Sequence, residues 1–237
     1  MIVAEVGLNH LGNIFFAKRY ASMLSKVESI DGITFQVRES EYRKKRPHMF
    51  FDVSEYEDIF KIIKNNHKLA GAAINSIDMV DFFEGLEADF YKVIRDGVFN
   101  RELLSLLSKT EKPILVSTGI CTSEDLSALS EYIKEIDGDI RLIYTNRISS
   151  RLEDANISKI KELKKYCTKV AYGSHCDSYV DLFLSLPYQP SDLLFYVKDT
   201  SMGLNFDDNS WAIDMHEVED VLNKIRLYNC ALGGGES

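Results

Sequence analysis

Cationic side chains close or follow several short apolar segments of this sequence, where they could surround an anion. An unpaired buried charge is costly, so such a group of cations needs an anionic partner. We expect a bound phosphate or carboxylate, also contacted by two hydroxyl groups. The candidate anion ligands are Lys92, Arg95, Arg147, Lys198, Ser117 and Thr118. The alternative is pairing within the protein, with Glu5, Asp96 and Asp199 as the carboxylates.

Two other residues at the ends of apolar segments, His175 and Asp199, could ligate a divalent ion. Imidazole and carboxylate groups are both common metal ligands, and Glu5 or His10 could add a further one. A hydrogen-bonding role is the alternative for a single histidine in such a position.

Several common catalytic motifs are absent from the sequence. No GxSxG frame surrounds Ser117, and no GxGxxG or GxxxxGK[ST] loop occurs, which argues against a serine hydrolase, a Rossmann cofactor and P-loop ATP use. The 4 cysteines form no CxxC pair, so we expect free thiols. A Schiff-base lysine, Lys92 or Lys198, stays open because an amine beside other cations loses its proton more readily.

Eight short apolar runs are rich in β-branched or aromatic residues, which is typical of strands covered on both faces. These runs are Ile2–Val6, Gly32–Val37, Leu69–Ile74, Phe90–Val93, Pro113–Thr118, Ile140–Thr145, Lys169–Tyr172 and Leu193–Val197. Segments with helical spacing lie between or after them. They are Phe15–Val27, Ser54–Asn66, Ile77–Leu86, Asn100–Lys109, Ser123–Ile136, Asp154–Tyr166, Ser178–Leu186 and Met215–Tyr228.

Eight strands alternating with eight helices predict an α/β protein, a (β/α)8 TIM barrel, rather than the alternative open doubly wound sheet. No linker divides the chain, so we expect a single domain over residues 1–230 and a flexible tail over residues 231–237. One long, basic connection, Arg38–Val53, could be a functional lid or a solvated loop. In such barrels the chemistry lies where the strands end.

The composition limits the class of protein. The 237 residues carry a formal net charge of −9, which argues against a nucleic acid partner. No apolar run reaches the roughly 18 residues of a transmembrane helix, so no membrane partner is expected. The first residues lack the features of a signal peptide, and we therefore expect a cytoplasmic protein.

Six segments, in the correct order, resemble motifs of the sialic acid synthase (N-acetylneuraminate synthase) family. Ile2–Asn13 is similar to the family's opening IAEIGxNHxGD, and Lys112–Ile120 to its KPIILSTGM. The other four are Ile33–Gln36 (VKFQ), Asp89–Leu104 (DAYKIxSGExxNxxLL), Thr145–Asn146 (CTNxYP) and Ala171–His175 (GYSDH). The similarity covers residues 2 to 220.

The resemblance implies a TIM barrel that condenses phosphoenolpyruvate with an N-acetylhexosamine, or a related sugar aldehyde, to a nonulosonic or deoxy-ulosonic acid plus phosphate. It also implies a divalent metal, Mn²⁺ or Mg²⁺, acting as a Lewis acid on the aldehyde. The catalytic candidates are then Glu5, His10 and Asn146. Phosphoenolpyruvate would contact Lys92, Arg95, Ser117, Thr118 and Lys198, and the metal would contact His175 and Asp199.

The sequence departs from the family pattern at several positions. Thr34 replaces the lysine of VKFQ, Gly97 the acid of SGE, Ile148 or Ser149 the tyrosine of CTNxYP, and Asp199 a metal-ligating histidine. The family's C-terminal antifreeze-like domain does not follow the barrel, so a homodimer or a partner chain could supply it. Two alternatives therefore stay open: a non-catalytic homologue or partner subunit that binds a sugar acid, and a lysine-dependent aldolase or lyase.

Overall fold

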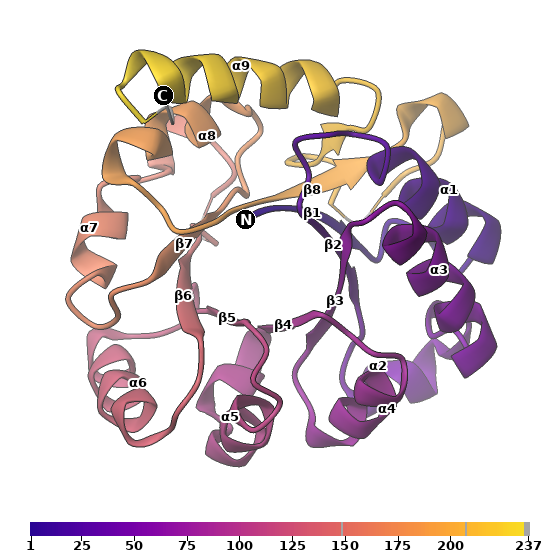
Figure 1. The fold of residues 1–237 in the computed structure, drawn as a ribbon, viewed down its shortest axis with the longest axis horizontal. Coiled ribbons are helices and arrows are strands. Elements are labelled where there is room, and N and C mark those ends of the chain that lie inside the picture. Colours follow the sequence, from indigo (N-terminus) through magenta and orange to yellow (C-terminus); the bar gives the residue numbers. More distant parts are fainter. Residues whose placement is uncertain (148, 207, 235–237) are drawn as a thin grey trace.

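The predicted (β/α)8 barrel is confirmed by a computed structural model, which describes residues 1–147, 149–206 and 208–234. Its parallel strands pair in chain order, and the first also pairs with the eighth, which closes the ring (Figure 1). A short further strand, β9, pairs with the end of β8. The strands are β1 (Ile2–Gly7), β2 (Gly32–Gln36), β3 (Leu69–Ile74), β4 (Phe90–Val93), β5 (Ile114–Ser117), β6 (Ile140–Tyr144), β7 (Val170–Gly173), β8 (Leu193–Lys198) and β9 (Ile213–Asp214).

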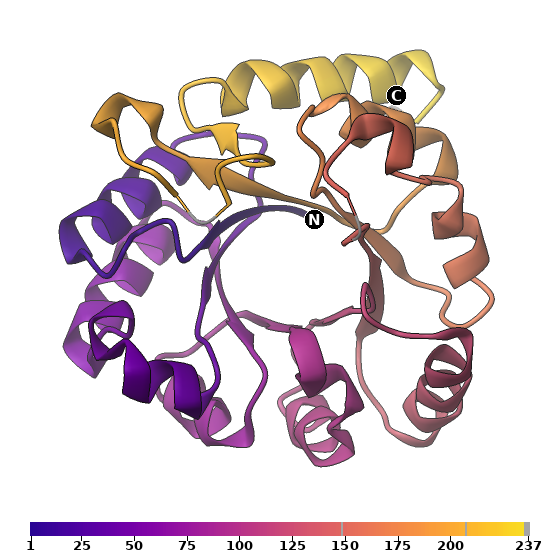
Figure 2. The ribbon, with the colours of Figure 1, turned by 180° about the vertical axis from the view of Figure 1, so that it is seen from behind.

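Helices surround the ring and cover the outer face of the sheet (Figure 2). They are α1 (Ile14–Leu24), α2 (Ser40–Lys45), α3 (Val53–Asn65), α4 (Val80–Gly85), α5 (Arg101–Ser108), α6 (Ser123–Glu135), α7 (Lys159–Leu163), α8 (Val180–Ser185) and α9 (Val218–Ala231). Their buried apolar side chains and the outward-facing strand residues form one large core. No helix in the described residues is long and apolar enough to cross a membrane, and no disulfide joins the four cysteines.

Local hydrogen bonds explain where the observed helices differ from the predicted ones. α3 begins one residue before the predicted Ser54 because Asp52 caps it, accepting a hydrogen bond from the Glu55 amide at 2.8 Å. The predicted helix over 154–166 is shortened to α7, since Asn156 has a left-handed φ of 47° that interrupts a helix. α9 continues through Ala231, one residue beyond the predicted end of the barrel domain.

The predicted long loop Arg38–Val53 is partly regular structure. It contains α2 and a 3₁₀ turn, Pro47–Met49. Met49 and Phe51 are buried and attach the segment to the barrel, whereas Lys44 and Lys45 of α2 are exposed. The buried apolar side chains of Met49 and Phe51 thus hold in place a basic segment that the sequence suggested was a loop.

Side chains inside the ring form layers, because every second residue of a strand points to the same face. The middle layer is an apolar cluster made of Val3, Phe90, Leu115, Ile143, Ala171 and Leu194. Phe90 fills the centre: a Cβ added to Gly71 would lie 2.3 Å from its ring and one added to Gly32 2.8 Å away. Glycine at these two positions therefore makes room for the large ring.

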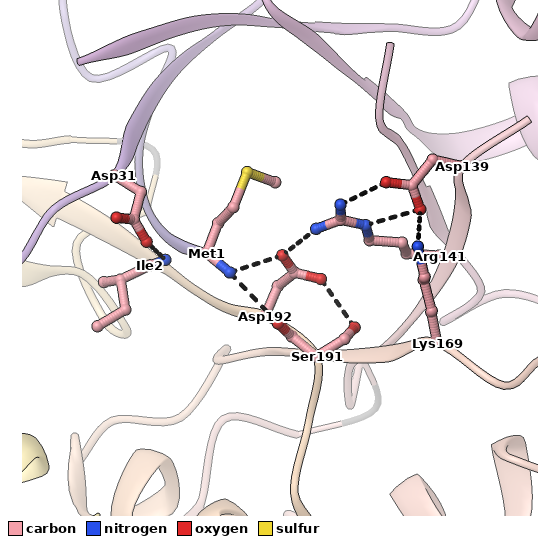
Figure 3. Close-up of polar contacts among 8 residues, drawn as sticks. All are labelled: Met1, Ile2, Asp31, Asp139, Arg141, Lys169, Ser191 and Asp192. Atoms are coloured by element: carbon pink, nitrogen blue, oxygen red, sulfur yellow. Dashed lines mark hydrogen bonds and ion pairs between the residues drawn. The ribbon is translucent and has the colours of Figure 1, made fainter. Parts of the chain in front are cut away.

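Two residues before the middle layer along the strands, several inward-facing residues are charged. They lie at the amino end of the barrel. The Asp192 carboxylate accepts hydrogen bonds from the Met1 amino group at 2.9 Å and from the Arg141 guanidinium at 2.6 Å (Figure 3). The Asp139 carboxylate in turn accepts from Arg141 at 3.1 Å and from Lys169 at 2.7 Å. Each of these cations has a carboxylate within hydrogen-bonding distance. We call this group the lower ion network.

Candidate active site at the carboxyl end of the barrel

Two residues after the apolar middle layer, the inward-facing strand residues form a polar layer. This polar layer lies beneath a cavity of about 430 Å³. Lys92 of β4, Ser117 of β5 and Tyr196 of β8 line this cavity. They follow the middle-layer residues Phe90, Leu115 and Leu194 by two positions, so the strand period alone directs them inward. The remaining described lining residues come from β2 and from the segments that follow β1, β2, β4, β6, β7 and β8. We call this space the first cavity.

A buried ion pair lies at the base of the first cavity. The Lys92 ammonium donates a hydrogen bond to the Glu5 carboxylate of β1, and these side chains are only 5% and 3% exposed. Lys92 Nζ also lies 5.5 Å from the ring centroid of Tyr196, within the range of a cation–π contact. Burial raises the pKa of Tyr196 well above its usual range, so this phenol stays protonated.

Three arginines extend the positive charge around the cavity. Arg38 follows β2 and binds Glu39 through two hydrogen bonds of 3.0 Å. Arg95 follows β4 and comes no closer than 3.8 Å to the Glu39 carboxylate. Arg147 follows β6 and forms no ion pair with any described residue. Arg38 therefore has a carboxylate partner at hydrogen-bonding distance, whereas Arg95 and Arg147 have none that close among the described residues.

The absence of a side chain at Gly119 leaves room for the Arg147 side chain. A Cβ at this glycine would lie 2.9 Å from both Cγ and Cδ of Arg147 and 2.8 Å from Cγ2 of Thr145. Any larger residue would displace the arginine stem. The Ser117–Gly119 segment therefore provides both a lining hydroxyl and the space over which a cation from the neighbouring strand passes.

The charge balance of the first cavity is opposite to that of the whole chain. Its described lining carries four cations, from Arg38, Lys92, Arg95 and Arg147, and one carboxylate, from Asp208. The chain as a whole has a net charge of −9. A concave surface with this local excess of positive charge attracts small anions.

His175 follows β7 and enters the cavity as a neutral imidazole. Its Nδ1 lies 2.6 Å from the Thr145 hydroxyl, and its ring stacks on Tyr196 with centroids 5.3 Å apart. Burial, together with the charges of Lys92 and Arg147, lowers the pKa of His175 to about 3. At neutral pH this ring can therefore accept a hydrogen bond or ligate a metal without losing a proton.

The structure brings six of the predicted site residues into the lining of one cavity. They are Lys92, Arg95, Ser117, Asn146, Arg147 and His175. Glu5 joins them through its bond to Lys92. The Asn146 side-chain amide donates to the carbonyl of Asp154 at 2.6 Å, so it also ties together the segment that follows β6.

His10, predicted as catalytic, lies outside the described lining of the first cavity. Its side chain is fully buried, with the ring 4.6 Å from that of Phe51, and its Nδ1 accepts a hydrogen bond from the Gly12 amide at 3.0 Å. Burial lowers the pKa of His10 to about 3. In this position His10 fixes the turn after β1.

Two predicted anion ligands also lie elsewhere. The Thr118 hydroxyl is buried and donates to the carbonyl of Ile143 at 2.8 Å, because Thr118 is one residue past the inward-facing Ser117. Lys198 lines a different cavity and donates to the carbonyl of Asn209 at 2.6 Å. Neither residue reaches the lining of the first cavity.

The predicted metal ligands His175 and Asp199 are not brought together on that lining. The Asp199 carboxylate is fully buried, accepts from Arg19 of α1 at 2.6 Å and caps the turn at Ser201. These bonds direct it toward the helical layer. The described part of the chain contains no group of three or more His, Cys, Asp and Glu side chains arranged to hold a metal ion.

The sequence prediction missed Gln36, Arg38, Asp208 and Trp211 as lining residues. Gln36 and Arg38 could have been found, since they continue the every-second-residue pattern of β2. Asp208 and Trp211 lie after β8 in a segment that has no such pattern. Gly97 leaves no room for a side chain, because a Cβ there would lie 2.8 Å from Cα of Asn75. Ile148, noted as a departure, is outside the described residues.

Comparisons with known proteins identify relatives of this barrel. The model of the NeuB family matches residues 20–186. An uncharacterised protein of Methanocaldococcus jannaschii is 27% identical over 249 residues, which covers 99% of this chain and 72% of that protein. The pseudaminic acid synthase of Campylobacter jejuni is 22% identical over 260 residues, covering 99% and 75%. A crystal structure of the N-acetylneuraminic acid synthetase of Leptospira borgpetersenii superposes with a TM-score of 0.88 at 18% identity, covering 99% and 85%.

Proposed function

The chain belongs to the NeuB family, and from this membership we propose that it is a phosphoenolpyruvate-dependent synthase of sugar acids. It would condense phosphoenolpyruvate with a sugar aldehyde to give a nonulosonic or deoxy-ulosonic acid and phosphate. The observation that supports this proposal best is the first cavity, where the described lining contributes four cations, a neutral imidazole and one carboxylate. The names of the relatives, among them a pseudaminic acid synthase, agree with this class of reaction.

Phosphoenolpyruvate carries a phosphate and a carboxylate, which the cavity can hold through charge-assisted hydrogen bonds. The Arg95 guanidinium comes no closer than 3.8 Å to the Glu39 carboxylate, and Arg147 forms no ion pair within the described residues. The Ser117 hydroxyl is a further donor on the same lining. Planar guanidinium groups match phosphate and carboxylate oxygens two at a time, so these residues would fix both ends of the substrate.

The reaction forms one carbon–carbon bond, forms a carbon–oxygen bond from water to C2, and breaks the bond between C2 and the phosphate oxygen. The double-bond electrons of phosphoenolpyruvate attack the aldehyde carbon from C3, and the aldehyde oxygen takes up a proton. Water adds to C2, loses a proton, and phosphate leaves with the bonding electrons. In this proposal the Glu5–Lys92 pair serves both proton movements: the Lys92 ammonium donates at the developing negative oxygen, and the Glu5 carboxylate accepts from the attacking water.

A divalent metal, Mn²⁺ or Mg²⁺, remains part of the proposal on the strength of the resemblance alone. It would act as a Lewis acid on the aldehyde oxygen. The described residues do not fit the predicted ligand pair, since only His175 lines the cavity while Asp199 bonds to Arg19. The steps proposed above therefore use the side chains of the chain and no metal.

One observation favours a second candidate, a non-catalytic homologue that binds a sugar acid. Asp199 occupies the position of a metal-ligating residue in the resemblance, yet its carboxylate is committed to Arg19 and Ser201. The lysine-dependent aldolase has less support, because the Lys92 ammonium is paired with Glu5, whereas a Schiff base requires a neutral amine.

The deciding experiment measures phosphate release from phosphoenolpyruvate with a panel of free and phosphorylated hexoses and N-acetylhexosamines. Each mixture is tested with Mn²⁺, with Mg²⁺ and with a chelator, and a mixture without sugar is the control. Sugar-dependent phosphate release supports the synthase. Thermal stabilisation by phosphoenolpyruvate without phosphate release from any mixture supports the binding protein. An absence of both effects rejects the phosphoenolpyruvate site.

A further inference from the structure

A second cavity, of about 680 Å³, opens beside the first one. It lies among the segments that follow β7 and β8 and the start of α9. Trp211 lines both cavities and is the one described residue that they share. His175, on the first side, contacts the Trp211 ring edge-on with centroids 5.6 Å apart. A ligand that passes Trp211 could therefore occupy both spaces.

The two cavities have opposite charge. The first has four lining cations and one described carboxylate. The described lining of the second has three carboxylates, from Asp177, Asp214 and Glu217, against Lys198 and the imidazole of His216. A phosphate group is repelled by such a lining, whereas hydroxyl groups can donate hydrogen bonds to it.

The protein already uses part of this lining. The Asp214 carboxylate accepts from the Thr200 amide at 3.0 Å and from the His216 amide at 2.9 Å, and Lys198 donates to the Asn209 carbonyl at 2.6 Å. Asp177 and Glu217 make no side-chain hydrogen bond or ion pair within the described chain. The groups left for a ligand are thus acceptors.

Trp211 also has an unused hydrogen-bonding group. Its indole Nε1 is buried and has no partner in the described residues. Buried donors of this kind are rare in proteins because each one costs free energy. The indole ring offers a flat apolar face beside that donor, a combination suited to a sugar, which has C–H groups on its faces and hydroxyl oxygens at its edges.

We propose that the second cavity binds the uncharged, hydroxyl-bearing end of the sugar substrate, the end remote from its aldehyde. This inference rests on the proposed function, which places phosphoenolpyruvate and the aldehyde in the first cavity. The sugar extends past Trp211, and its remote hydroxyls donate to Asp177 and Glu217. The preferred substrate is therefore an unphosphorylated sugar.

Trp211 makes the test direct, because it is the only tryptophan of the sequence. Its fluorescence is recorded while phosphoenolpyruvate is added, and then while N-acetylmannosamine, N-acetylglucosamine, mannose or the 6-phosphates of these sugars are added to the saturated protein. We expect phosphoenolpyruvate and at least one uncharged sugar to change the emission in a saturable way. The corresponding 6-phosphate should bind at least tenfold more weakly.

The paired substitution D177N/E217Q tests the carboxylates. It should weaken binding of the uncharged sugar by at least tenfold, because hydrogen bonds to charged acceptors are stronger than those to neutral amides. Binding of phosphoenolpyruvate should stay unchanged. E219Q is the matched control, because Glu219 is exposed in the first turn of α9, two residues after Glu217, and does not line the second cavity.

Three results would overturn the inference. They are tighter binding of the 6-phosphate, unchanged sugar affinity in D177N/E217Q, and a response to phosphoenolpyruvate but to none of the uncharged sugars. A protein that ignores phosphoenolpyruvate yet binds an uncharged sugar through Asp177 and Glu217 would contradict the proposed function instead, and would keep the second cavity as a sugar site.

Discussion

The two ends of the barrel use the same kinds of side chain in different proportions. In the lower ion network, the Met1 amino group, Arg141 and Lys169 each lie within 3.1 Å of a carboxylate oxygen of Asp139 or Asp192 (Figure 3). Around the first cavity, Lys92 and Arg38 are paired. Arg95 is 3.8 Å from a carboxylate and Arg147 has none among the described residues.

The difference separates a structural role from a binding role. Charges that the protein neutralises itself, as at the lower end, stabilise the fold and leave little attraction for a ligand. At the upper end, Arg95 and Arg147 are exposed to water and have no carboxylate closer than 3.8 Å among the described residues, so they can attract an anion. The apolar middle layer keeps the two groups apart, so each end can be tested separately.

The largest effect is expected for Lys92→Met. This change removes the cation at the base of the first cavity and leaves the buried Glu5 carboxylate alone. Turnover should fall about 10³-fold, the usual cost of losing one preorganised charge at a reaction centre. Steady-state phosphate release measures it, and urea unfolding confirms that the variant is folded. Turnover within tenfold of the wild type in a folded variant would contradict the proposed role of the pair.

Arg141→Met should instead affect stability. Its guanidinium bonds Asp139 and Asp192, whose carboxylates would lose a partner. The free energy of unfolding should fall by about 3 kcal/mol, as when one member of a largely buried pair is removed. Urea denaturation gives this value, and turnover per folded molecule should be unchanged. A folded variant with impaired catalysis would show that the two ends are not independent.

Arg147→Gln should act on binding. The substitution removes the cation that lacks a described partner, so we expect the KM for phosphoenolpyruvate to rise about 30-fold, within the range for one charge-assisted hydrogen bond. Arg147→Lys should recover part of the loss. Arg151→Gln is the matched control, since Arg151 is on the same loop and is also exposed, but it pairs with Glu153. An unchanged KM would place the phosphate elsewhere.

As pH falls, the free energy of unfolding should first lose the contribution of groups at the upper end of the barrel. The pKa of His10 is lowered from 6.5 to about 3, so below pH 6.5 the unfolded chain takes up a proton that the folded chain refuses, and stability falls with pH. His10 alone contributes a loss of about 1.4 kcal/mol per pH unit, or about 2 kcal/mol at pH 5, and His175, whose pKa is also lowered to about 3, adds to it. Asp139 has a pKa of about 2, held down by its hydrogen bond to Arg141, so its contribution is lost only as pH falls from 3.8 through 2.

The measurement is the urea midpoint and slope between pH 7 and 4.5. His10→Asn, which has no imidazole to titrate, should show a pH dependence smaller by up to one proton. The same pH dependence in both proteins would mean that His10 is protonated in the folded state.

The barrel could be predicted because the strand signal is local. Each run of apolar residues is long enough to specify a buried strand, and the alternation of elements leaves few topologies. The same local signal placed Lys92 and Ser117 correctly, since each follows an inward apolar residue by two positions. The sequence did not indicate the middle layer or the lower ion network, although both obey the same spacing.

The misplaced residues lie where the regular period ends. Thr118 and Asp199 come just after their strands, and the bonds that orient them, to Ile143 and to Arg19, join positions 25 and 180 residues apart. His10 belongs to a turn whose packing against Phe51 depends on the segment after β2. Trp211 follows a stretch without regular spacing. Side-chain direction at these positions depends on tertiary contacts, which no local pattern encodes.

The pairing that closes the ring has a consequence for folding. β1 pairs with β2 early in the sequence, but its other neighbour, β8, begins only at Leu193. During synthesis one edge of β1 therefore stays unpaired until almost the whole barrel has been made. Contacts between residues so distant in sequence form slowly. Glu5 and Tyr196 come from the two strands of this seam. The proposed binding site is therefore complete only when this seam is closed, and a chain open at the seam would lack it.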